Sequence, residues 1–327
     1  MIILQSSQKD VGFPVRRALP VEGCRALGPF VFVDHMGPAQ FAANETSGDV
    51  RPHPHIGLAT FTYLFSGGFM HRDSLGTEQR IEPGAVNLMA AGKGIVHSER
   101  VPQDIRNSGS EVEGMQLWLA LPKPLEAMKP EFSNYPAREF QGSKAHGYSL
   151  KVLAGQWAGR ASPVKAYSPT IALDIEFEPG GSFSLRCEDL LGENSLGQES
   201  GSILNLELGL YIAKGEVELD ASTTAKAGDL VILRASKKSP CSLADAAQSL
   251  ADDHWLLMAQ TDARVLVLGG EALDAPRYLW WNFVASSKER IEQAKADWQQ
   301  GRFPSLASDV EFIPLPQEQT SELGRKA

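Results

Sequence analysis

The chain has 327 residues, 43% of them hydrophobic, which is enough to form two domains with separate cores. Its net charge is -9, with 40 acidic and 31 basic residues and no dense run of lysine and arginine, so direct nucleic-acid binding is not expected. No apolar stretch approaches the roughly 20 residues that span a bilayer, and the polar N-terminus does not resemble a signal peptide; no membrane partner is expected. The widely spaced Cys24, Cys187 and Cys241 favour core residues or free thiols in a reducing compartment, the cytoplasm.

Short runs of β-branched and aromatic residues, separated by Gly, Pro, Asn and Asp, predict an all-β fold of antiparallel strands in a sandwich or barrel. In chain order the predicted strands include residues 59–65, 86–89, 115–120, 171–177, 210–213, 230–233 and 264–268. Helical periodicity is scarce until the end of the chain. There Ser287 begins a capping-box pattern, and Ile291, Ala294 and Trp298 follow at helical spacing until Gly301, which predicts one C-terminal helix.

An internal repeat accounts for the length of the chain. Tyr63 and Tyr211 begin similar hairpins about 148 residues apart, and Gly84 and Gly228 begin similar turn-strand units about 144 residues apart. The proline-rich stretch 122–147 is predicted to link the two copies. The predicted organisation is therefore an N-terminal domain at 1–140, a C-terminal domain with the terminal helix at 141–304, and a tail at 305–327.

Two pairs of side chains have the spacing of metal ligands. His53 and His55 are two residues apart, as are His97 and Glu99, and residues i and i+2 of a strand project from the same face. In a rolled-up barrel the two pairs can converge on one ion, and imidazole and carboxylate donors suit Fe, Mn, Co, Ni, Zn or Cu. Pro54 removes a ladder donor, so its strand is expected to be an edge, a strand start or an irregular segment.

The motifs around these pairs occur in a distinctive order. They are His53-Pro54-His55, Thr62-Tyr63-Leu64, His71-Arg72-Asp73-Ser74-Leu75-Gly76, Pro83-Gly84, Met89-Ala90-Ala91-Gly92 and Gly94-Ile95-Val96-His97-Ser98-Glu99. Together they resemble the pirin family of the cupin superfamily, strongly over residues 10–120 and more loosely as far as Leu273 and the closing helix. The resemblance implies a bicupin, a tandem double-stranded β-helix of two jelly-roll barrels, with a C-terminal helix.

The resemblance also implies that the ligands of one divalent metal ion are His53, His55, His97 and Glu99. Iron(II) is the usual metal, with Mn, Co, Ni, Zn or Cu as alternatives. General cupins often place a glutamate ligand four residues after the second histidine, where this chain has Ala59, so the carboxylate must come from Glu99.

The second copy lacks these ligand types. Aligned by the repeat, it has Gly201 and Ile203 opposite the first pair, and Cys241 and Leu243 opposite the second. The C-terminal domain is therefore expected to bind no metal.

Quercetin 2,3-dioxygenase activity is the function that the resemblance implies, with a flavonol or related aromatic or enediol substrate and O2 as partners. Glu99 would be both a ligand and the nearest base for the substrate hydroxyl, although a metal-bound carboxylate must loosen before it takes a proton. Two alternatives remain. One is a metal- or redox-responsive regulator that binds a protein partner, as some pirins are described, and the other is a barrel that the metal only stabilises.

Other residues are assigned structural roles. His71 and Asp73 are expected to hold a turn or a salt-bridge network rather than to act in the site. For His35, near a Gly-Pro turn, contact with the site mouth is the less favoured interpretation. The cluster Trp280-Trp281-Asn282-Phe283 is expected to pack the terminal helix onto its domain.

Overall fold

The computed structural model describes residues 1–190, 206–234, 253–306, 309 and 311–316. The chain forms two compact units whose segments alternate in the sequence. Unit 1 comprises Met1–Ser7, Arg17–Phe30 and Arg138–Ala272, and unit 2 comprises Gln8–Arg16, Val31–Ala137 and Leu273–Ala327. The longest segment of each unit contains one copy of the predicted repeat.

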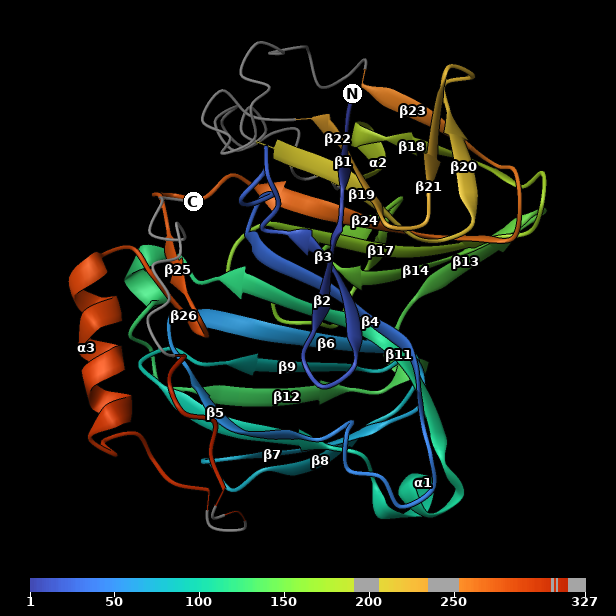
Figure 1. Cartoon of the computed structure of the whole chain (residues 1–327). Coiled ribbons are helices and arrows are strands. Elements are labelled where there is room, and N and C mark those ends of the chain that lie inside the picture. The colour runs from blue at the N-terminus through green and yellow to red at the C-terminus, as the bar shows by residue number, and fades with distance from the viewer. Residues whose placement is uncertain (191–205, 235–252, 307–308, 310, 317–327) are drawn as a thin grey trace. The chain divides into compact units, whose positions relative to one another are not determined.

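Unit 2 is built mainly from two antiparallel sheets (Figure 1). The seven-stranded sheet has the order β12 (Glu131–Tyr135), β9 (Val86–Ala90), β6 (Leu58–Ser66), β11 (Ser110–Ala120), β4 (Phe30–Phe41), β3 (Pro14–Leu19) and β2 (Ser7–Asp10). The four-stranded sheet has the order β5 (Val50–His55), β10 (Ile95–Arg100), β7 (Phe69–Asp73) and β8 (Glu78–Ile81). Phe41 and Leu64 of the first sheet share one buried cluster with Phe69 and Ile81 of the second. The core therefore lies between the sheets.

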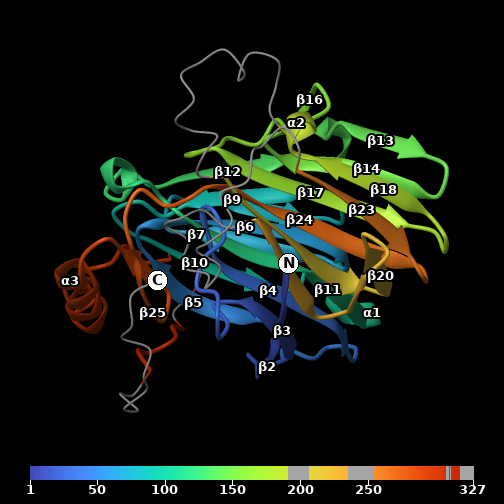
Figure 2. The same ribbon diagram turned by 90° about the horizontal axis from the view of Figure 1, so that it is seen from above.

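Unit 1 repeats this architecture (Figure 2). Its seven-stranded sheet has the order β1 (Ile2–Gln5), β22 (Asp229–Arg234), β19 (Leu206–Lys214), β24 (Ala263–Glu271), β17 (Thr170–Phe177), β14 (Tyr148–Ala154) and β13 (Gly142–Ala145). The four-stranded sheet has the order β18 (Ser182–Arg186), β23 (His254–Ala259), β20 (Glu216–Leu219) and β21 (Thr223–Lys226). Ile175 and Val267 pack in one core with Phe183 and Leu257. The prediction of an all-β fold with two similar β-sheet domains is confirmed.

Short elements connect the strands. They are α1 (Gln103–Ser108), η1 (Lys123–Leu125), η2 (Ala137–Glu139), β15 (Gln156–Trp157), β16 (Arg160–Ala161), α2 (Cys187–Leu190), β25 (Tyr278–Trp280) and β26 (Phe283–Ala285). None of the helices in the described part of the chain has the length and hydropathy needed to cross a membrane.

The predicted C-terminal helix is α3 (Lys288–Gln299), which lies beside β25 and β26 (Figure 1). The hydroxyl oxygen of its N-cap, Ser287, accepts a hydrogen bond from the backbone N–H of Arg290 at 3.3 Å. Ile291 on the buried face of α3 packs with Phe283 and Ile56, so the aromatic segment holds the helix as predicted. The helix consequently belongs to unit 2, whereas the predicted boundaries place it with residues 141–304.

The proline-rich stretch predicted as a linker contains strand β12, which pairs with β9 along five residues from Glu131↔Ala90 to Tyr135↔Val86. Pro130 and Pro136 lie just outside β12, and β12 is the edge strand of its sheet, so the prolines interrupt no ladder. The chain passes from unit 2 to unit 1 between Ala137 and Arg138.

Two of the three cysteines lie in the described part of the chain. Cys187 is a free, buried thiol, and burial raises its pKa to about 11. Cys24 is a buried core residue, one of the two predicted roles, and it is disulfide-bonded rather than a free thiol. Cys241 lies outside the described residues.

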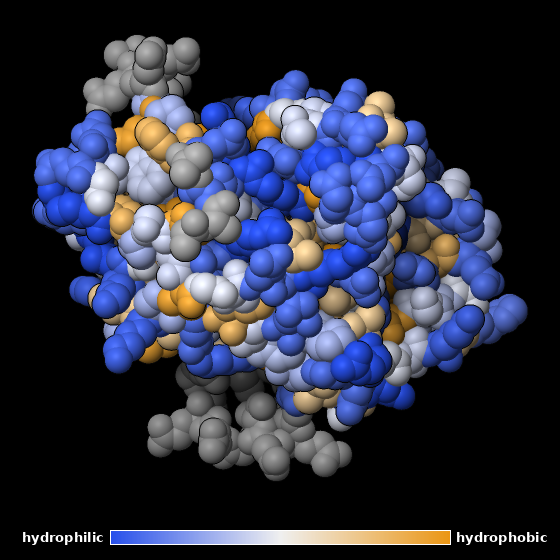
Figure 3. Space-filling model, turned by 90° about the horizontal axis from the view of Figure 1, so that it is seen from below, coloured by the Kyte–Doolittle hydropathy of each residue, from blue (hydrophilic) through white to orange (hydrophobic). Residues whose placement is uncertain are grey.

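Hydrophobic and hydrophilic residues are interspersed on the face of the molecule drawn in Figure 3. Leu75, Leu256 and Phe312 are among the large apolar side chains that are exposed. Scattered exposed apolar residues are ordinary for a folded protein and do not by themselves indicate a partner.

Candidate metal centre

The predicted ligands lie on two neighbouring strands of unit 2. His53 and His55 are on β5 and His97 and Glu99 are on β10, with His53 directly opposite His97 in the antiparallel register. A register shift between His97 and Glu99 bends β10 next to the site. β5 is the edge strand of its sheet, as expected from Pro54.

Three of the four predicted side chains come together. One nitrogen atom from each of His53, His55 and His97 lies within 4.8 Å of the others, and this is the one group in the described part of the chain that could hold a metal. The Nε2 atoms of His55 and His97 are 3.1 Å apart, and the ring of His53 is centred 4.4 Å from that of His97. All three rings are buried, with at most 6% of each residue exposed.

Hydrogen bonds behind the cluster determine which nitrogen atoms face its centre. Nδ1 of His53 donates to the carbonyl of Arg51 at 2.8 Å, and Nδ1 of His55 donates to the carbonyl of Asn282 at 3.2 Å, because a carbonyl only accepts. In a neutral imidazole the proton on Nδ1 leaves a lone pair on Nε2. Both rings therefore direct a lone pair away from these carbonyls, the arrangement found behind metal-ligating histidines.

The electrostatics favour neutral imidazoles. Burial lowers the pKa of His53 to about 4, against a smaller opposing effect of its hydrogen bond to Arg51. Burial also holds the pKa values of His55 and His97 well below the ordinary value, and repulsion among the neighbouring histidines adds to the shift. At neutral pH the cluster thus has unprotonated donor atoms, which is the state that a metal ion requires.

Glu99 is half-buried and is not part of the three-histidine group. Burial raises its pKa, although the electrostatic interaction with the neighbouring His71 and a hydrogen bond from Thr62 act in the opposite direction. The Thr62 hydroxyl lies 3.5 Å from a Glu99 oxygen and 3.0 Å from Oε1 of Gln116. A chain of polar groups thus runs from β11 through β6 to the carboxylate on β10.

His71 and Asp73 form the predicted structural pair on β7. Nε2 of His71 lies 3.0 Å from Oδ2 of Asp73, while Oδ1 of Asp73 accepts the backbone N–H groups of Leu75 and Thr77 and holds the turn. Burial alone would raise the pKa of Asp73, but these hydrogen bonds, chiefly that from His71, outweigh it and lower the pKa. The structure adds a contact that the sequence interpretation did not include, because Nδ1 of His71 lies 3.3 Å from Nδ1 of His97.

Two aromatic rings pack next to His55. Trp118 on β11 meets the ring of His55 edge to face at 5.2 Å, and Phe32 on β4 stacks on Trp118 at 3.9 Å. His35, also on β4, is buried and lies 3.0 Å from Glu113 and 2.9 Å from Arg16, in a polar network of its own.

Some supporting groups left no signal in the sequence. The carbonyl of Asn282 is a backbone group more than 200 residues away from its partner, so no residue type indicates it. His71 did have a signal, since its two-residue spacing from Asp73 repeats that of the ligand pairs. The positions aligned with the ligands in the second copy, Gly201, Ile203, Cys241 and Leu243, lie outside the described residues.

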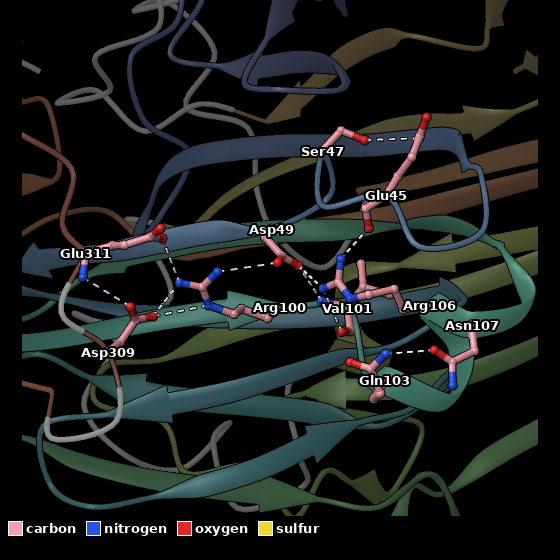
Figure 4. Close-up of polar contacts among 10 residues, drawn as sticks. All are labelled: Glu45, Ser47, Asp49, Arg100, Val101, Gln103, Arg106, Asn107, Asp309 and Glu311. Atoms are coloured by element: carbon pink, nitrogen blue, oxygen red, sulfur yellow. Dashed lines mark hydrogen bonds and ion pairs between the residues drawn. The ribbon is translucent and has the colours of Figure 1, made fainter.

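On β10, the residue after Glu99 anchors the C-terminal segment of unit 2. Figure 4 shows Arg100 between Asp49 and the two acidic residues Asp309 and Glu311. Asp49 is also paired with Arg106 and accepts the backbone N–H of Val101 at 2.9 Å. Part of the predicted tail is therefore bonded to the strand that carries His97.

Comparisons with known proteins agree with this architecture. The Pirin family profile matches residues 12–119, and the profile of the Pirin C-terminal cupin domain matches residues 202–304. A pirin-like protein of Caulobacter vibrioides is 40% identical to the chain over 97% of the chain and 99% of its own length. Two crystal structures described as quercetin 2,3-dioxygenase from Acinetobacter baumannii match as well. One has a TM-score of 0.81 and 28% identity over 99% of this chain and 97% of its own, and the other a TM-score of 0.79 and 25% identity over 94% and 98%. The chain therefore belongs to the pirin family of cupin proteins.

Proposed function

We propose that this pirin is a metal-dependent dioxygenase that cleaves quercetin, or a related flavonol or enediol, with O2. The observation that carries the proposal is the convergence of three buried, neutral imidazoles, those of His53, His55 and His97. Glu99 lies two residues along β10 from His97 and outside this group, so its role as a ligand is part of the proposal. The similarity to structures described as quercetin 2,3-dioxygenase supports the choice of substrate.

In this proposal His53, His55 and His97 hold one divalent ion, with Glu99 as the fourth ligand. Iron(II) is the preferred metal, and the nitrogen and oxygen donors also suit Mn, Co, Ni, Zn or Cu. The ion would supply a positive centre that binds the deprotonated oxygen of the substrate and brings O2 chemistry to it. Four protein ligands leave one or two positions open on a five- or six-coordinate ion.

Glu99 is the proposed proton acceptor for the substrate hydroxyl. A metal-bound carboxylate has a depressed pKa, so Glu99 must leave the ion before it takes the proton. Once released, its burial raises its pKa and makes it a stronger base than a hydrated carboxylate. The Thr62 hydroxyl keeps contact with the carboxylate, and Gln116 in turn keeps contact with Thr62. Trp118, on which Phe32 stacks, packs against the ring of His55, and all three side chains are buried.

The test begins with protein purified anaerobically, its metal determined by elemental analysis. Quercetin consumption and oxygen uptake are then measured for the native chain, for His97→Ala, and for His146→Ala as a control that removes an exposed histidine of unit 1. About one metal ion per chain, with turnover lost only in His97→Ala, supports the proposal.

Two results would contradict different parts of the proposal. Stoichiometric metal without consumption of quercetin or of a small panel of enediols would reject the dioxygenase and leave the metal site. A folded native protein that takes up none of the listed divalent ions would reject the metal site itself.

A further inference from the structure

The ring of His97 differs from those of His53 and His55 in the hydrogen-bond partner of its Nδ1 atom. His53 and His55 are each oriented by a backbone carbonyl, whereas Nδ1 of His97 faces Nδ1 of another histidine, His71, at 3.3 Å. Two imidazole nitrogens form a hydrogen bond only when one carries the proton and the other offers a lone pair. The position of that proton decides which nitrogen of His97 is free to bind.

We infer that His71 and Asp73 are positioning residues: the pair orients His97 and keeps the lone pair of its Nε2 directed at the metal. Asp73 accepts the proton on Nε2 of His71 at 3.0 Å, so a neutral His71 has its lone pair on Nδ1. That lone pair accepts the Nδ1 proton of His97. Nε2 of His97, 3.1 Å from Nε2 of His55, is then left with its own lone pair.

The surroundings of the pair fix its geometry. His71 and Asp73 are 3% and 4% exposed, so water does not compete for their hydrogen bonds. Strand register places Asp73 opposite His97 and His71 opposite Glu99, and Phe132 stacks on the His71 ring at 4.5 Å with an interplanar angle of 23°. Asp73 is fixed in turn by the backbone N–H groups of Leu75 and Thr77.

The opposite proton arrangement would be incompatible with the metal. If His71 donated through Nδ1, His97 would accept there and carry its own proton on Nε2, pointing at His55 and blocking coordination. The carboxylate of Asp73 cannot donate in return, so it holds the proton of His71 on Nε2, on the side away from His97. An outer partner of this kind is commonly worth about 10–100-fold in metal affinity.

This inference rests on the proposed metal site, and its test measures metal binding rather than turnover. His71→Phe keeps a ring for Phe132 to stack on but removes both nitrogens. His71→Asn loses the ring but keeps an acceptor, because Oδ1 of asparagine occupies about the place of Nδ1. The matched control is His35→Phe, which removes another fully buried histidine of unit 2 that is bonded to a carboxylate.

Affinity is measured by competition between the metal-free proteins and a chelator for Ni²⁺, and the ligand geometry by the d–d absorption of the Co²⁺ forms. We expect about 10–100-fold weaker Ni²⁺ binding and an altered Co²⁺ spectrum in His71→Phe, substantial recovery in His71→Asn, and native values in His35→Phe. If His71→Phe does not fold, Asp73→Asn serves instead. It leaves His71 in place but lets the amide donate to Nε2, and weaker binding is again expected.

The outcomes separate the two proposals. A native protein that binds no Ni²⁺ or Co²⁺ overturns the metal site and this inference with it. A native protein that binds, with His71→Phe or Asp73→Asn binding as tightly, overturns the positioning role alone. Equal losses in His71→Phe and His71→Asn would assign the effect to packing and would also overturn it.

Discussion

Acid should destabilise the metal-free protein through its buried histidines, and His53 gives the clearest case. Burial lowers its folded-state pKa to about 4, whereas in the unfolded chain the value is 6.5. Between these values the unfolded state binds a proton that the folded state does not, so the free energy of unfolding falls as the pH falls from about 6.5 towards 4. Above pH 6.5 the neutral His53 makes its full contribution to the free energy of unfolding, and below pH 4 this contribution is lost.

The size of the effect follows from the shift. The difference between a pKa of 6.5 in the unfolded chain and about 4 in the folded chain corresponds to roughly 3 kcal/mol of unfolding free energy. About 2.5 kcal/mol of this stability should be lost when the pH falls to 4.5. His55 and His97 act in the same direction, because their pKa values are also lowered by burial. Carboxylates titrate near this range too, so the contribution of His53 has to be isolated by comparison with a variant.

The assay is urea unfolding of the chelator-treated protein at pH 7.5 and 4.5, for the native chain and for His53→Gln, whose side chain stays neutral at both values. The loss of stability on acidification should be smaller in His53→Gln by about 2.5 kcal/mol. His146→Gln, which replaces an exposed histidine, should show the native loss. Equal losses in His53→Gln and the native chain would refute the account of a buried, neutral His53.

Three further predictions concern the frame around the site. Gly57→Ala should lower the free energy of unfolding by at least about 2 kcal/mol in thermal or urea unfolding, because φ is +67° and the new Cβ would meet the Val284 carbonyl oxygen at 2.0 Å. Gly76→Ala, at φ +88° with open space around it, should cost only about 1 kcal/mol, and equal losses would contradict the role of the close approach. Ser287→Ala should destabilise α3 by about 1 kcal/mol, measured as a lower thermal midpoint, while Ser287→Thr should retain most of it. Asp49→Asn should lower the stability by roughly 2 kcal/mol, since both of its arginine partners lose a counter-charge, and high salt should reduce the difference between the variant and the native chain.

Much of the fold was predictable because it rests on local rules. Period-two spacing predicted that His53 and His55 face the same side, and the similar hairpins at Tyr63 and Tyr211 predicted a duplicated β-domain. Ser287 predicted the start of the terminal helix because an N-cap is a property of a few consecutive residues.

The rest depends on contacts between distant segments. The carbonyl of Asn282 behind His55, and the packing of α3 near Ile56, join residues separated by more than 200 positions. No periodicity or composition of a local segment encodes such a pairing, so the sequence alone groups the terminal helix with the copy that precedes it in the chain. Glu99 shows how far the spacing rule extends at the site. Two-residue spacing places Glu99 on the same strand face as His97, but it does not determine whether the carboxylate joins the three histidines, and the structure leaves it outside their group.

The alternation of the two units along the sequence has a consequence for synthesis. Unit 2 needs residues from Val31–Ala137 and from Leu273 onward, and all of Arg138–Ala272 is translated between them. During synthesis, therefore, about 135 further residues are added after the strands that carry the histidines and before Asn282, α3 and the acidic partners of Arg100 are made. The hydrogen bond behind His55 and the packing of α3 against Ile56 can therefore form only after the residues of the intervening unit have been synthesised.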